Sequence, residues 1–160
     1  MEAKVTATNK SPTRAVRKKN HQYMKRTATA VWQGSVKEGS GHLTTKSTVL
    51  EHTSYSYKSR FEDGKGTNPE ELIAAAHSGC FTMALSAKLG EAGYTPTELH
   101  TDCAVDFQDQ TIKESHLTVK AKVDGIEKDE FDKIINDAKV NCPISKVLDT
   151  NITLEYTLNG

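Results

Sequence analysis

Three cysteines are the residues of this 160-residue chain whose side chains could carry out covalent chemistry: Cys80, Cys103 and Cys142. Three thiols cannot all pair with one another inside one chain. The sequence has no C-x-x-C pair and no two histidines at metal-ligand spacing, so a structural zinc site is not expected. We therefore expect free thiols in a reducing compartment, the cytoplasm.

Two of these cysteines have a setting that the local sequence defines. Cys142 directly precedes Pro143 at the predicted start of a short helix, where unpaired N–H groups and the helix dipole favour a thiolate. The same position also suits an incidental residue at a helix start, and the residues leave both interpretations open. Cys103 lies in the middle of a predicted strand and is expected to be a small packed residue.

Cys80 lies well inside a predicted helix, beyond the reach of the helix dipole. A reactive thiolate there needs a nearby cation. His77, three residues earlier, could neighbour it on the helix surface, and a Cys–His dyad would indicate acyl transfer or hydrolysis. Two side chains at this spacing point outward side by side, however, and no third group orients the histidine. From the residues alone, a buried core cysteine is the favoured interpretation of Cys80.

The helix that carries Cys80 is predicted over 69–90. Asn68 is a good N-cap, Pro69 fits the first helical position, and Glu71 stands where it completes a capping box. The helix is apolar on nearly every face, so most of its surface must be covered. A chain of this length has little material for that purpose, which suggests packing against the same helix of a second copy.

The other predicted elements are strands in runs with few helices, which indicates the α+β class. Apolar and polar residues alternate in the strand candidates, and one amphipathic helix follows them. The strands are expected at 27–33, 43–50, within 51–61, and at 98–107, 112–125 and 151–158; the helices at 127–141 and from Pro143 onward.

Charge divides the chain into an extension and a single domain. Residues 1–23 hold six basic residues and one acidic residue, a net charge of +5, whereas residues 24–160 carry −5. We expect 1–23 to be a poorly ordered basic extension, and it lacks the apolar segment of a secretory signal. No apolar run reaches the roughly 20 residues of a membrane span. The acidic domain shows no nucleic-acid-binding face.

Two segments of the chain resemble a known family. "RFEDGKGTNPEELIAAAHSGCFTMALS" and "CPISKVL" closely resemble the osmotically inducible protein C (OsmC) family, thiol-dependent peroxidases of bacteria. The resemblance extends from Met24 to the C-terminus, and the sister branch of organic hydroperoxide resistance proteins shares the "GTNPE…CF" core. It implies an OsmC-like α+β fold, with antiparallel sheets around central apolar helices in an intertwined homodimer.

The resemblance also implies roles for four residues. By match, Cys80 is the peroxidatic cysteine and Cys142 the resolving one, while Arg60 stabilises the thiolate and Glu70 holds the arginine. From the residues alone, Arg60 would be a solvated arginine on an edge strand, and Glu70 an ordinary partner of the helix dipole.

Two points about this site stay open in the sequence. Glu70 and Glu71 compete for the arginine, and we prefer Glu70 because Glu71 already belongs to the capping box. Ten residues separate Glu70 from Cys80, about 15 Å along an unbroken helix. Arg60 must therefore come from the partner chain, or the helix must bend, for which the Ser78–Gly79 pair is a suitable place.

The expected function is reduction of organic peroxides and, more weakly, hydrogen peroxide, in oxidative or osmotic stress. A Cys80 sulfenic acid and then a Cys80–Cys142 disulfide form, and a dithiol, possibly a lipoyl protein, reduces the disulfide; the resemblance implies no cofactor. The alternative is a non-enzymatic, dimeric thiol sensor or binding protein on the same fold. Apolar residues that could favour alkyl hydroperoxides are Leu72, Ile73, Phe81 and Met83.

Overall fold

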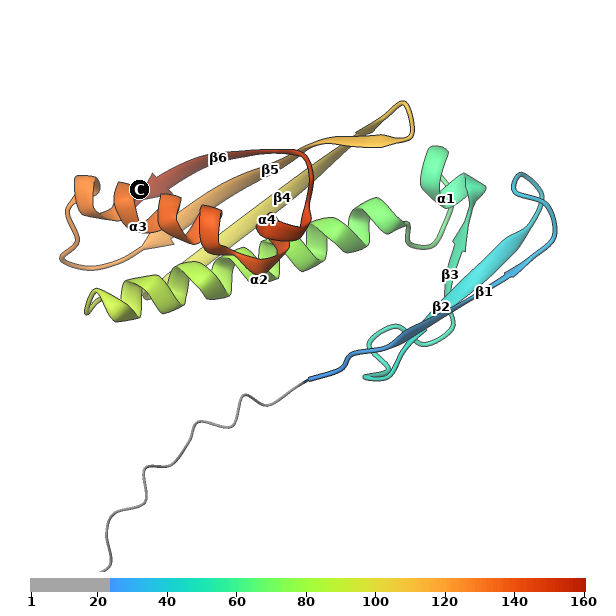
Figure 1. Ribbon diagram of the computed structural model, residues 1–160, viewed down its shortest axis with the longest axis horizontal. Helices are drawn as coiled ribbons and strands as arrows, with labels where there is room; N and C mark the ends of the chain where they lie inside the picture. The colour runs from blue at the N-terminus through green and yellow to red at the C-terminus, as the bar shows by residue number, and fades with distance from the viewer. Residues whose placement is uncertain (1–23) are drawn as a thin grey trace, which may run out of the picture.

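A computed structural model describes residues 24–160, so the predicted basic extension over 1–23 lies outside the described residues. The described chain begins with a three-stranded antiparallel sheet in the order β1-β2-β3. Its strands are β1 (Ala28–Gln33), β2 (Ser40–Thr45) and β3 (Thr53–Ser56). This N-terminal sheet stands at one end of the molecule, apart from the second sheet (Figure 1).

The prediction of a strand over 43–50 was correct in kind but wrong in its bounds. β2 begins earlier, at Ser40, and ends where a turn with Thr48 at a φ of 60° leads into β3. Gly41 lies inside the strand, and the position requires glycine because a Cβ there would clash with the Val31 carbonyl oxygen and come within 2.6 Å of the Tyr55 ring. The glycine that indicated a turn instead lets two aromatic rings close over the sheet.

The predicted edge strand within 51–61 is only partly correct. It is β3 up to Ser56, and the chain then forms a short helix, α1 (Tyr57–Phe61). The Ser56 hydroxyl accepts a hydrogen bond from the Ser59 N–H, and the Ser59 hydroxyl in turn bonds the Ser56 backbone. This capping box places Arg60 on a helix rather than on a strand.

The long helix α2 (Pro69–Glu91) confirms the prediction over 69–90. The Asn68 side chain accepts a hydrogen bond from the Glu71 N–H at 2.8 Å, as expected of an N-cap. The Glu71 carboxylate, however, accepts a hydrogen bond from the Thr67 hydroxyl at 2.7 Å. The predicted capping box is therefore only half formed: Asn68 caps the helix, but the Glu71 carboxylate bonds Thr67 instead of the Asn68 backbone N–H.

The second sheet has the order β4-β5-β6, with strands β4 (Glu98–Gln108), β5 (Thr111–Lys122) and β6 (Asn151–Leu158). β4 and β5 form a long hairpin whose turn residues, Asp109 and Gln110, both have positive φ. β6 pairs with β5 in parallel, so this pairing departs from the antiparallel sheets that we expected. A parallel return requires a crossover, which the intervening helices provide.

That crossover contains α3 (Lys128–Asn141) and α4 (Pro143–Val147). α2 contacts β4, α3 and α4, so the helices lie together against the second sheet (Figure 1). The core between these helices and the sheet is made of Phe81, Leu85, Leu89, Leu117, Val119, Ala121, Val123, Ile126, Phe131, Ile135, Ala138 and Cys142.

α2 is long and apolar enough to meet the length and composition of a membrane span. Its Phe81, Leu85 and Leu89 side chains are nevertheless fully buried in the core, and the helix packs along β4 and α3. α2 is therefore the central helix of the packed domain.

Candidate active site

The N-terminus of α4 meets the middle of α2 at Cys80. Cys142 is the N-cap residue of α4, as the sequence predicted, and its thiol is fully buried. Cys80 is partly exposed, and its sulfur has the Cys142 side chain and the Ile144 backbone N–H as hydrogen-bonding neighbours. The fold thus brings the two predicted thiols together across 61 intervening residues, and both are free.

The surroundings of Cys80 within the protomer do not favour its thiolate. Burial raises the pKa of the Cys80 thiol above its ordinary value, and the neighbouring Cys142 raises it further. A hydrogen bond from the Ile144 N–H acts in the opposite direction and lowers this pKa, but burial is the larger effect. An activated Cys80 therefore needs a cation in addition to these groups.

Arg60 and Glu70 form a bidentate ion pair at the start of α2. The Arg60 Nη2 donates to a Glu70 carboxylate oxygen at 2.7 Å, and Nε lies 3.2 Å from both carboxylate oxygens. The guanidinium also lies 4.9 Å from the Phe107 ring centre and 5.2 Å from that of Phe61. This geometry favours Glu70 over Glu71 as the partner of the arginine.

The structure does not bring this ion pair to Cys80 within one protomer. α2 continues as a helix through Ser78 and Gly79, without the bend that we considered there (Figure 1). Glu70 and Cys80 are ten residues apart, which is about 15 Å of helix. The groups expected to act together thus form two separate pairs in the described chain.

His77 does not face Cys80. Its ring is fully buried, with Nδ1 2.7 Å from the Ser115 hydroxyl and Nε2 2.9 Å from the Ser145 hydroxyl. Because both ring nitrogens already have partners, His77 is not poised as the base of a cysteine hydrolase. Sequence reasoning missed both serines, although Ser145 lies within the "CPISKVL" segment.

A surface cleft of about 440 Å³ adjoins the ion pair. Arg60 and Glu70 line it together with the apolar side chains of Ile73, Phe107 and Val147. Of the apolar residues considered from the sequence, Ile73 lies in this cleft and Leu72 is half-buried. Phe81 belongs to the closed core, and Met83 is 77% exposed.

Comparisons with known proteins identify the family of this chain. Residues 62–157 match the model of the OsmC-like protein family. The chain is 48% identical over 135 residues to the peroxiredoxin OsmC of Escherichia coli, covering 82% of this chain and 94% of the relative. It is 32% identical over 101 residues to organic hydroperoxide resistance protein-like 1 of Staphylococcus epidermidis, covering 58% of this chain and 72% of that protein.

Solved structures share the fold. An OsmC-like protein from Mycoplasma pneumoniae superposes with a TM-score of 0.66 at 15% identity, covering 84% of this chain and 97% of that one. The organic hydroperoxide resistance protein OhrB of Bacillus subtilis gives 0.59 at 24% identity, covering 83% and 98%. Fold, family model and sequence identity agree with the resemblance found in the sequence, and the chain belongs to the OsmC family.

Proposed function

We propose that Cys80 is the peroxidatic nucleophile of this chain and that Cys142 is its resolving thiol. The chain is a cysteine-based, thiol-dependent peroxidase of peroxide stress defence, which its named relatives support. One observation carries the residue assignment: a partly exposed Cys80 lies against a fully buried Cys142. A peroxide can therefore reach Cys80 from solvent, whereas Cys142 is shielded and can react only with the oxidised Cys80 beside it.

The Cys80 thiolate attacks the outer oxygen of the hydroperoxide, the O–O bond breaks, and the leaving alkoxide takes up a proton. Cys80 is oxidised by two electrons to a sulfenic acid, and the peroxide is reduced to an alcohol. The Cys142 sulfur then attacks Cys80, and the hydroxyl group leaves as water while the disulfide forms. An external dithiol reduces this bond by two exchange steps.

Organic hydroperoxides are the substrate class that we propose. The name of the Staphylococcus epidermidis relative refers to organic hydroperoxide resistance. In this chain, the cleft beside Arg60 is lined by Ile73, Phe107 and Val147, so an alkyl group would find apolar surface there. We expect hydrogen peroxide, which lacks an alkyl group, to be the weaker substrate.

A homodimer would supply the cation that Cys80 lacks. Gly79 lies in the helix interior, where glycine costs about 1 kcal/mol relative to alanine, and Gly90 lies in the last turn; a Cβ at either position would meet open space. Met83, on the same face, is 77% exposed. Small residues on an uncovered apolar face suit close packing against a second copy of α2.

The symmetry of such a dimer can be tested against the site. In an antiparallel pair of α2 helices, the partner's position 70 lies level with Cys80 along the helix axis only if the two-fold axis passes midway between these positions, at Ala75. Ala75 and the adjacent Ala76 are exposed, and their small side chains permit a close crossing. The partner's Arg60, held by the partner's Glu70, would then approach the Cys80 thiolate and lower its pKa.

We place the enzyme in the cytoplasm, where free thiols persist and reducing dithiols are available. Its reductant is a small dithiol or a protein-bound one, and a lipoyl protein is the candidate that we favour. The Cys80–Cys142 disulfide is the bond that this reductant must reach.

The residue assignment is tested by counting thiols after one equivalent of cumene hydroperoxide. Wild type should lose two thiols, Cys142→Ser should lose one, and Cys80→Ser should lose none and consume no peroxide. Cys103→Ser is the matched control and should behave as wild type. Peroxide consumption by Cys80→Ser at the wild-type rate would contradict the assignment and favour a thiol sensor or binding protein.

The shared site is tested by mixing two inactive variants. A heterodimer of one Cys80→Ser protomer and one Arg60→Ala protomer contains one intact site if the arginine acts across the interface. It contains no intact site if the arginine acts within its own chain. Recovery of about half the wild-type activity per heterodimer supports the shared site, and no recovery rejects it.

A further inference from the structure

The buried imidazole of His77 joins three elements of the fold. His77 lies on α2, its Nδ1 partner Ser115 lies on β5, and its Nε2 partner Ser145 lies on α4. All three residues are at most 9% exposed. The bond to Ser145 is therefore a buried polar link between the helix that carries Cys80 and the short helix that begins at Cys142.

Both ring nitrogens can be satisfied without a charge. Burial lowers the pKa of His77, which favours the neutral imidazole. A neutral imidazole has one N–H donor and one acceptor nitrogen, and a serine hydroxyl can serve as the partner of either. The two serines therefore match the neutral ring. A charged ring would lose its hydration on burial and would find no counter-ion among these partners.

α4 is held on α2 and α3 by the apolar contacts of Cys142 and Ile144, and the link to His77 adds a directional polar contact to this packing. α4 has five residues, far fewer than a helix needs for stability of its own, and the Cys142 side chain does not cap it. Pro143 is exposed and Val147 is 78% exposed. Ser145 is the buried polar side chain of α4, three residues after Cys142 and directly after Ile144.

We propose that His77 is a positioning residue, whose hydrogen bond to Ser145 holds α4 on α2 so that the Cys142 thiol stays at Cys80. The proposal rests on the proposed function for the step that it serves. That step is disulfide closure, in which the Cys142 sulfur attacks the Cys80 sulfenic acid, the S–S bond forms and water leaves. Without the link, Cys142 spends less time within reach, and the sulfenic acid persists and becomes open to further oxidation by excess peroxide.

Four variants of the full chain separate this role from general loosening of the core. Ser145→Ala removes the link to α4, and Ser115→Ala removes a matched hydroxyl from the other side of the same ring. His77→Gln keeps a polar group near the position of Nε2 and can still reach Ser145. His77→Asn keeps one near the position of Nδ1 and can reach only Ser115.

The measurement is a single turnover with one equivalent of cumene hydroperoxide. The Cys80 sulfenic acid is trapped with dimedone over time, and the disulfide is quantified by peptide mass. We expect closure to slow by about five- to tenfold in Ser145→Ala and His77→Asn, the factor that loss of one buried hydrogen bond produces. Closure should stay within about twofold of wild type in Ser115→Ala and His77→Gln. Equal slowing in all four variants, or in none, would overturn the proposal.

A second oxidant distinguishes failure of this proposal from failure of the peroxidase assignment. Diamide joins two neighbouring thiols into a disulfide without any peroxide chemistry. If peroxide does not oxidise Cys80 in wild type, the proposed function fails, but Cys80–Cys142 closure by diamide still reports on the link. Slower closure by diamide in Ser145→Ala than in Ser115→Ala supports the link, and equal rates reject it.

Discussion

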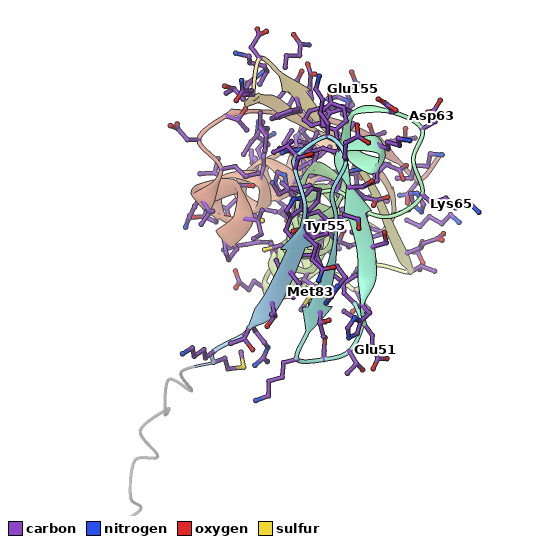
Figure 2. The ribbon with its side chains drawn as sticks, turned by 90° about the vertical axis from the view of Figure 1, so that its right-hand side faces the viewer. Glu51, Tyr55, Asp63, Lys65, Met83 and Glu155 are labelled. Atoms are coloured by element: carbon purple, nitrogen blue, oxygen red, sulfur yellow. The ribbon has the colours of Figure 1, made fainter. Side chains whose placement is uncertain are left out.

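The two ends of the molecule differ in how they are stabilised. The second sheet, with α2, α3 and α4, encloses a core of fully buried side chains, including Phe131 and Leu85. The N-terminal sheet and α1 bury only Ser59 among their residues in the described chain, and no strand of this sheet has a buried position. Figure 2 views this sheet, with Glu51, Asp63 and Lys65 pointing away from the body.

The proposed catalytic residues come from both of these regions. Cys80 and Cys142 are positioned by the packed core, whereas Arg60 lies on α1, beside the sheet that lacks a core of its own. An element with so little buried apolar surface is marginally stable alone. We infer that the N-terminal sheet gains its remaining packing from the second protomer, and that it delivers the arginine in doing so.

The largest expected difference between the two regions is in the free energy of unfolding. Phe131→Ala removes a fully buried ring and should lower that free energy by about 3–5 kcal/mol. Val31→Ala in β1 should lower it by less than about 1 kcal/mol, because this side chain is already 38% exposed. Urea unfolding at one fixed protein concentration measures both values. Equal losses would contradict the comparison.

Arg60→Ala tests whether the weakly packed region contributes to catalysis. Without the guanidinium, burial keeps the pKa of Cys80 raised, so peroxide consumption at pH 7 should fall about 10- to 100-fold. The thiolate fraction grows with pH, so the deficit should shrink as pH rises above about 8.5. Lys58→Ala, which removes a neighbouring charge on α1, is the control and should keep the wild-type pH profile. A deficit independent of pH would contradict activation by charge.

Met83→Lys tests whether a second copy covers the exposed face of α2. A lysine there would place two like charges in an apolar interface, so the dimer should dissociate at least tenfold more readily, about 1.4 kcal/mol. Sedimentation at several protein concentrations measures this effect. Val140→Lys replaces a 64% exposed valine on α3 and should leave assembly unchanged. Unaltered assembly in Met83→Lys would place the interface elsewhere.

The smallest expected effect is a pH dependence of the free energy of unfolding, which we attribute to His77 in the packed region. Burial lowers the pKa of His77 below its ordinary value of 6.5, so the unfolded chain binds a proton that the folded chain does not. Stability should therefore fall as pH drops below about 6.5, by at most about 1.4 kcal/mol per pH unit. Urea unfolding should show a smaller difference between the free energies of unfolding at pH 7.5 and pH 5.5 in His77→Gln than in wild type. His52→Gln, at an exposed site beside β3, should retain the wild-type difference.

The sequence was informative wherever a signal is local. The Asn68 cap and Pro69 predicted the start of α2, and Pro143 predicted the start of α4, because capping depends on neighbours in the chain. The alternation in 98–107 and 112–125 predicted the long hairpin. The prediction failed at Gly41, because this glycine makes room for Trp32 and Tyr55 on the neighbouring strands and does not form a turn.

The sequence by itself determined the family, the long central helix and the residue types needed for thiol chemistry. The resemblance implied that Cys80 meets Cys142 and that Glu70 holds Arg60, whereas tertiary structure alone decided that these two pairs lie apart within one protomer and that His77 bonds two serines rather than the thiol. The physical reason is that helix caps and periodic patterns depend on a few adjacent residues. Contacts across a core depend on how separate elements pack, and no local pattern records that.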